Sequence, residues 1–225
     1  MVMWTALFLL VAPAVEGSGV PVSETREFRG FTRVASHGNF VVTVTQAKRF
    51  EVVVTADDNL FPLVVTTVKD GTLHLDEAEP LQPKSPIRIN VRAPRVDAVM
   101  LAGGGNMVVR AVKGASLETT LSGEGTLDAQ ANVNTWKVRV SGAGDATLAG
   151  RARTLEVSLS GAGNIHARAV SAVRVRARVS GAGTAEVTTR DVVDAQVSGA
   201  GGVRYGGNPK TVTKKVSGVG SVTPL

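Results

Sequence analysis

Apolar and polar residues alternate through most of the C-terminal half of the chain, in blocks that a Ser-Gly-x-Gly motif separates. Six copies of the motif begin at Ser122, Ser141, Ser160, Ser180, Ser198 and Ser217, in steps of 19, 19, 20, 18 and 19 residues. A degenerate copy, Ala102-Gly103-Gly104-Gly105, precedes them. A fixed period of this length indicates a repeat architecture in which each repeat packs on its neighbours.

When the repeats are aligned on the serine, the apolar residues fall into columns. The column one residue before the serine holds Leu101, Leu121, Val140, Leu159, Val179, Val197 and Val216, and the column five residues after it holds Met107, Leu127, Ala146, Ile165, Ala185, Val203 and Val222. The columns three before and seven after are also mostly apolar. Alternation with period two is typical of strands with one buried face. The pattern predicts an all-β fold, a single right-handed parallel β-helix over residues 94–225 with rungs of about 19 residues stacked about 4.8 Å apart.

Charged residues in the outward columns support the same alignment. Four residues before the serine, the column reads Glu118, Lys137, Glu156, Arg176 and Asp194, with alternating sign. Opposite charges on neighbouring strands stabilise their register by about 0.2–1 kcal/mol per pair. An in-register stack of parallel rungs is therefore expected.

Before residue 94 the period is lost, and shorter alternating segments predict a β-rich head. Strands are expected over 40–46, 50–56, 63–69, 72–76 and 87–92. Asp70-Gly71 predicts a tight turn, and Pro80, Pro83 and Pro86 mark a loop. We expect residues 18–93 to form a head that caps the first rung and protects its open edge.

The N-terminus predicts export. An apolar run over residues 3–11, too short to span a bilayer, leads into Ala12-Pro13-Ala14, a small-x-small site of the signal-peptidase kind. We assign residues 1–17 to a signal peptide, cleaved after Ala14 or Gly17; a buried N-terminal strand is the alternative. The expected location is periplasmic, cell-surface or secreted, with no integral membrane segment after signal removal. With no cysteine, the chain has no disulfide, thiolate metal site or lipid-anchoring cysteine.

Composition limits the chemistry further. Aromatic residues make up 4% of the chain, so a core of aliphatic side chains is expected, and the 25 glycines fit a fold of tight turns. The net charge of +6 favours anionic partners. We expect no nucleic-acid partner and no cofactor. Oligomers could form through the solenoid ends.

Candidate catalytic and metal-binding residues are few. The recurring serine lacks the Gly-x-Ser-x-Gly order and the neighbouring base of a nucleophile elbow, so its glycines are expected to permit left-handed torsions and its hydroxyl to satisfy backbone groups. Calcium-binding repeats need an aspartate in every turn, and only Asp145 follows this motif. His37, His74 and His166 are scattered and are expected to be surface residues rather than ligands. We assign no catalytic, cofactor-binding or metal-binding residue. A polysaccharide lyase or hydrolase on a β-helix scaffold is the alternative, by analogy of fold alone.

A row of basic residues suggests a binding surface. The predicted stacking brings six outward-facing cations together, here named the cationic stripe: Lys137, Arg139, Arg174, Arg176, Arg178 and Lys215. Glu156 and Asp194 interrupt it, so a solvated face is the alternative. The stripe predicts docking of an anionic envelope polymer, such as an acidic polysaccharide or lipopolysaccharide.

Several motifs together resemble the bacterial head GIN domain family, a domain of unknown function described as an auto-transporter adhesin. The resemblance rests on Arg29-Gly30-Phe31, the segments 41–46, 56–60 and 70–73, and the repeated Ser-Gly-Ala-Gly. It implies a right-handed β-helix in a bacterial envelope protein and supplies no catalytic or ligand residues. The function expected is a non-catalytic adhesion, binding or structural module for an anionic envelope polymer or a partner protein.

Overall fold

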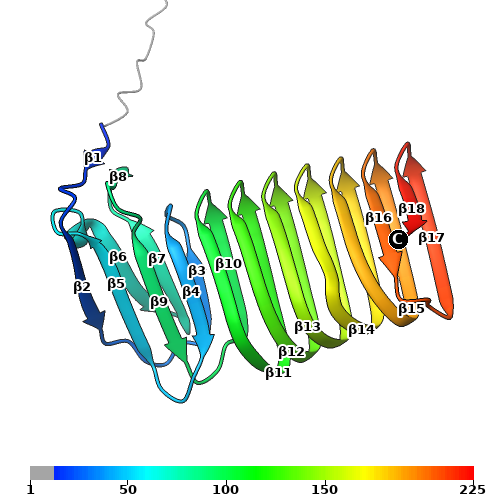
Figure 1. The fold of residues 1–225 in the computed structure, drawn as a ribbon, viewed down its shortest axis with the longest axis horizontal. Coiled ribbons are helices and arrows are strands. Elements are labelled where there is room, and N and C mark those ends of the chain that lie inside the picture. The colour runs from blue at the N-terminus through cyan, green and yellow to red at the C-terminus, as the bar shows by residue number, and fades with distance from the viewer. Residues whose placement is uncertain (1–12) are drawn as a thin grey trace, which may run out of the picture.

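The chain forms an elongated β-solenoid with a smaller β-rich head at its N-terminal end (Figure 1). The computed structural model describes residues 13–225. The predicted signal peptide falls mainly on residues 1–12, outside the described part. Residues 13–225 include one short 3-10 helix, Phe61–Leu63, and no helix that is long and apolar enough to cross a membrane.

Long curved strands build the solenoid, and each follows almost one complete coil. They are β11 (Asn106–Gly123), β12 (Thr126–Gly142), β13 (Asp145–Gly161), β14 (Asn164–Gly181) and β15 (Thr184–Gly199), followed by the shorter β16 (Gly202–Gly206), β17 (Thr211–Gly218) and β18 (Ser221–Pro224). Each coil pairs in parallel with the next, and equivalent serines such as Ser141, Ser160 and Ser180 face one another. The predicted solenoid with a repeat of about 19 residues is confirmed. In β11 to β15 the strand also continues around the third side of the coil, which connects the strand after one glycine turn to the strand before the next; in the last coil, residues 207–210 are not strand.

The predicted apolar columns form the core. Leu121, Leu127 and their equivalents in the following coils are almost completely buried, as one face of each strand turns inward. Val216 in the last coil is the exception in its column. It is 46% exposed because no further rung packs against that coil. Thr119 is the one polar residue in a buried column position, and its hydroxyl accepts a 3.0 Å hydrogen bond from Nε1 of the buried Trp136.

Glycine is required at the corner for two reasons, which the Ser160 coil illustrates. Gly161 has φ of 131°, a region that L side chains rarely adopt, and a Cβ there would lie 2.3 Å from the carbonyl oxygen of Gly142 in the preceding rung. Gly163 has no positive φ, but its Cβ would lie 2.0 Å from the oxygen of Gly144. The first glycine is therefore required both by its positive φ and by the close approach of the preceding rung, and the second is required by the close approach alone.

The head consists of shorter strands that join the solenoid through one hydrophobic core. They are β1 (Val15–Glu16), β2 (Pro21–Arg26), β3 (Arg33–Ser36), β4 (Val41–Gln46), β5 (Glu51–Asp57), β6 (Val64–Lys69), β7 (Thr72–Glu77), β8 (Leu81–Gln82) and β9 (Arg88–Ala93); the next strand, β10 (Ala98–Gly103), belongs to the first coil of the solenoid. Five of these match the segments predicted as strands within two residues. β1, β2, β3 and β8 were not predicted, and β8 lies in the segment predicted as a loop.

Parallel pairing connects the head to the first coil. β3 pairs with β10, and β4 pairs with β11, so the head extends the sheets of the solenoid (Figure 1). β2, β5 and β9 form antiparallel pairs at the far end, as do β6 and β7. The boundary at residues 93 and 94 stays a prediction, since the hydrogen-bonded sheet runs through it.

Candidate functional site

The six residues of the cationic stripe lie on outward columns of one sheet. Lys137 and Arg139 belong to β12, the three arginines 174, 176 and 178 to β14, and Lys215 to β17. One column runs in register from Arg139 through Ser158, Arg178 and Gln196 to Lys215. The structure therefore brings side chains from distant parts of the sequence onto one face, as the repeat predicted.

Part of this charge is neutralised within the sheet. Arg139 pairs with Glu118 on the neighbouring coil, and Arg176 lies 4.0 Å from Glu156. Exposed pairs of this kind contribute at most about 1 kcal/mol to stability. Among the described residues, no carboxylate lies within 4.0 Å of the other four stripe cations, Lys137, Arg174, Arg178 and Lys215.

The stripe includes a shallow depression near the C-terminal end. Arg178 and Lys215 line it together with Gln196 and four serines from four successive coils, around a volume of about 360 Å³. Its lining contains two cations and no carboxylate. The geometry suits an anionic group that also accepts hydrogen bonds from hydroxyls and amides.

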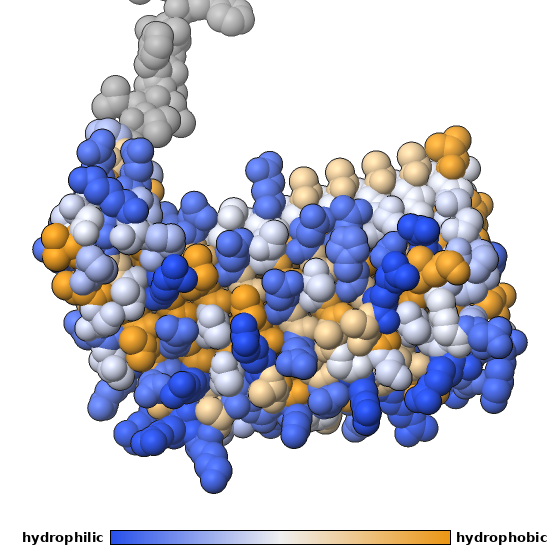
Figure 2. All heavy atoms as spheres, viewed as in Figure 1, coloured by the Kyte–Doolittle hydropathy of each residue, from blue (hydrophilic) through white to orange (hydrophobic). Residues whose placement is uncertain are grey.

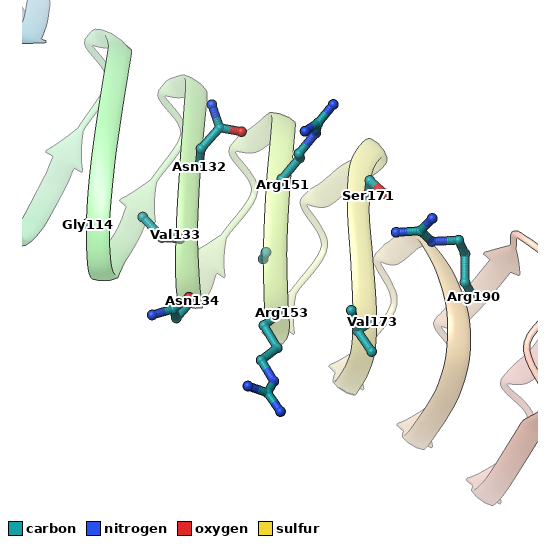
Figure 3. A pocket seen from close by; sticks show the side chains of 10 residues that line it. Gly114, Asn132, Val133, Asn134, Arg151, Arg153, Ser171, Val173 and Arg190 are labelled. Atoms are coloured by element: carbon teal, nitrogen blue, oxygen red, sulfur yellow. The ribbon is translucent and has the colours of Figure 1, made fainter.

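A larger groove lies on the third side of the coils (Figure 3). It encloses about 610 Å³, and we name it the arginine groove after the polar residues that line it: Asn132, Asn134, Arg151, Arg153, Ser171 and Arg190. Register explains its composition, because Arg151 lies between Asn132 on one side and Ser171 on the other. Two arginines from β13 and one from β15 thus meet on one continuous surface.

The arginines of the groove point in different directions around its opening. Figure 3 shows Arg151 and Arg153 extending toward opposite ends of the groove, while Arg190 reaches from the next coils back toward Ser171. No carboxylate lines the groove, and within residues 13–225 none lies within 4.0 Å of these three guanidinium groups. The groove therefore presents three uncompensated positive charges beside neutral hydrogen-bonding groups.

The groove was not predicted, because the aligned columns were those near the Ser-Gly-x-Gly motif and did not extend to this side of the coils. The available signal was the pair Arg151 and Arg153, spaced by two residues as on one face of a strand, one rung from the polar pair Asn132 and Asn134. A strand predicted on the third side would have placed Arg151 beside Asn132 on the neighbouring rung.

The glycine turns do not form a polar site. Figure 2 shows a row of small, weakly hydrophobic residues along the edge that the turns occupy in Figure 1. The serines before these turns, such as Ser160 and Ser180, are exposed rather than bonded to backbone groups as expected. Trp136 is completely buried and offers no exposed ring for stacking on a sugar.

The histidines are less scattered than the sequence indicated. His37 and His74 stack with ring centroids 5.9 Å apart, next to Asp76. His166 lies apart from them on β14, with Nδ1 3.6 Å from a carboxylate oxygen of Glu186.

Solved structures with the same fold cover almost the whole chain. The "putative adhesin" of Bacteroides fragilis NCTC 9343 is 22% identical, with a TM-score of 0.87, and the match covers 94% of this chain and 100% of that one. The "putative lipid binding protein" of Parabacteroides distasonis ATCC 8503 is 21% identical, with a TM-score of 0.81 and coverage of 95% and 100%. The "putative adhesin" of Parabacteroides merdae ATCC 43184 is 20% identical, with a TM-score of 0.74 and the same coverage.

At these identities, the similarity establishes the fold. No curated protein matches the sequence. A family match is clear, however: residues 30–209 match the family described as "Putative auto-transporter adhesin, head GIN domain", and the structural neighbours are named as adhesins and a lipid-binding protein rather than as enzymes. The chain therefore belongs to the head GIN domain family of adhesin-like β-solenoid proteins.

Proposed function

We propose that this protein is an exported, non-catalytic binding module of the bacterial envelope that docks an anionic polymer along its solenoid. The arginine groove is the primary site, and the cationic stripe is a second surface for the same kind of ligand. The observation that carries the proposal is the set of three arginines around a groove of about 610 Å³ whose lining holds no carboxylate.

Arginine suits this role because its planar guanidinium binds carboxylates and phosphates through two parallel hydrogen bonds. Arg151 and Arg190 flank Ser171, so an anion held between them also meets a hydroxyl group. Many such contacts along successive coils would each be weak. Their sum would be strongly salt-dependent, since exposed charges are screened over about 8 Å at physiological ionic strength.

The relatives support a binding role of this kind. Two of the similar structures are named as adhesins, and one is named as a lipid-binding protein. An acidic polysaccharide and the phosphorylated head group of a lipopolysaccharide share the anionic oxygens that the groove would recognise. We therefore propose an anionic envelope glycan or glycolipid as the ligand, at a periplasmic or cell-surface location.

The test measures binding to polygalacturonate and, separately, to vesicles containing phosphatidylglycerol. Arg151→Gln with Arg153→Gln should reduce affinity for the preferred ligand by about tenfold or more, as loss of hydrogen bonds to charged groups predicts. Arg139→Glu with Arg178→Glu should reduce it less. The matched control for the groove variant is Arg88→Gln with Arg110→Gln. It removes two positive charges, as the groove variant does, but from exposed positions outside both surfaces, and it should leave affinity nearly unchanged.

Three results would contradict the proposal. Equal losses in the groove variant and the control would mean that net charge alone attracts the ligand. Absence of binding to both probes at low salt would show that the protein does not bind an anionic ligand of either kind. Release of unsaturated uronate from polygalacturonate would instead favour a lyase.

A further inference from the structure

Two histidines and an aspartate meet on the outer face of the head. His74 and Asp76 lie two residues apart on β7, so both side chains leave the same face of the strand, and His37 follows directly after β3, the neighbouring parallel strand. His37 Nδ1 lies 2.8 Å from an Asp76 carboxylate oxygen. One ligand atom from each of the three residues lies within 4.8 Å of the other two.

The backbone around the cluster is held firmly. The amide of His37 donates a 2.9 Å hydrogen bond to the carbonyl of Leu75, which continues the parallel ladder between β3 and β7. Beyond it, Glu77 accepts a 2.7 Å hydrogen bond from the amide of Asn39 and thereby fixes the loop that follows His37. Three side chains on a fixed framework lose little further freedom when they bind a common ligand.

An ion pair explains only part of this arrangement. It accounts for His37 beside Asp76, but not for the second imidazole, which lies nearly parallel to the first at an interplanar angle of 11°. In the described part of the chain, His74 forms no hydrogen bond with another side chain. Two imidazoles and a carboxylate each offer one ligand atom to the same small region, and together they match the ligands that proteins use to bind a metal ion.

We propose that His37, His74 and Asp76 bind one divalent transition-metal ion, with Zn²⁺ the best fit. Two imidazole nitrogens exclude a typical Mg²⁺ or Ca²⁺ site, which uses oxygen ligands. Zn²⁺ takes nitrogen and oxygen ligands at about 2.0–2.2 Å, and in a tetrahedron such ligands lie about 3.3–3.6 Å apart. The ligand atoms of the cluster lie within 4.8 Å of one another, so side-chain rotation must shorten the larger separations, and the side chains of His37 and Asp76 are 40% and 39% exposed, which leaves them room to turn.

Three protein ligands leave the fourth tetrahedral position open. Water, or an oxygen of an anionic ligand, would complete the shell. The cluster lies in the head, whereas the arginine groove lies on coils built from β11 to β15. The metal site is thus independent of the proposed glycan binding, and either proposal can fail without the other.

The test is a titration of the chain from Val15 onward, produced without a histidine tag, with ZnCl₂ in competition with a chromophoric chelator. The wild type should bind one equivalent. His74→Gln and Asp76→Asn should each weaken binding by more than the roughly 10–100-fold that loss of an outer-sphere partner costs. His166→Gln is the matched control, because that histidine also lies beside a carboxylate but has no second imidazole near it, and it should bind like the wild type.

A spectroscopic measurement identifies the ligands directly. Co²⁺ substitution should give visible absorption bands typical of four-coordinate cobalt in the wild type, and His37→Gln, a change at an exposed position, should abolish them while the far-UV circular dichroism stays unchanged. No saturable binding by the wild type, or equal loss of binding in His166→Gln and His74→Gln, would overturn the proposal.

Discussion

Replacing Gly161 by valine perturbs the corner on which the whole stack depends. At φ of 131° a β-branched residue is strained, which costs about 1–3 kcal/mol. Its Cβ would also lie 2.3 Å from the Gly142 carbonyl oxygen, and forcing adjacent rungs apart to relieve such overpacking costs about 1–3 kcal/mol more. The reduced entropy of the unfolded chain returns about 0.4–1 kcal/mol. The net expectation is a loss of about 1–6 kcal/mol.

Thermal and urea unfolding, followed by circular dichroism, measure this loss. For a chain of this size, 1 kcal/mol corresponds to about 2–4 °C in Tm, so Tm should fall by about 2–24 °C. The matched control is Gly114→Val, because Gly114 lies on an exposed stretch of β11, has no positive φ and has open space where the Cβ would lie. It should change stability by less than about 0.5 kcal/mol. Equal effects at both glycines, or a Gly161→Val variant as stable as the wild type, would refute the corner argument.

Two further predictions concern the ends of the molecule. The mature protein should begin at Val15, because β1 pairs with β8 and cleavage after Gly17 would remove β1. Intact-mass measurement of protein from the envelope should give this N-terminus. A mature chain that begins at Ser18 would contradict the prediction. Lys214 covers the open end of the core by donating to the Val222 carbonyl and lying 5.1 Å from the Tyr205 ring. Lys214→Val should therefore promote end-to-end association in analytical ultracentrifugation, whereas a strictly monomeric variant would contradict the capping role.

The fold could be predicted because the solenoid repeats one local pattern. Burial at Leu121, Val140 and Leu159 follows from their alternation with polar residues, and the charges of Glu118 and Lys137 fixed the register independently. The third side was harder to predict. Its irregular bulges, as between Val109 and Val112 in β11, shift the alternation by one residue and hide the strand period.

The candidate sites depended on information that local patterns lack. The cationic stripe was predictable because its residues share columns with the repeat motif. The His37 and His74 pair was not, since these residues lie 37 positions apart and meet only because β3 and β7 pair in parallel within the irregular head. Pairing between segments without a repeat leaves no periodic trace in the sequence.

Hydrogen exchange with and without an anionic glycan tests directly whether the arginine groove binds such a ligand. Bound polygalacturonate should slow exchange in peptides that contain the arginine groove, around residues 151–153, 171 and 190, and this protection should disappear as salt rises to physiological strength. Protection confined to the head, or protection that is the same in the wild type and in the variant carrying Arg151→Gln and Arg153→Gln, would contradict binding in the groove.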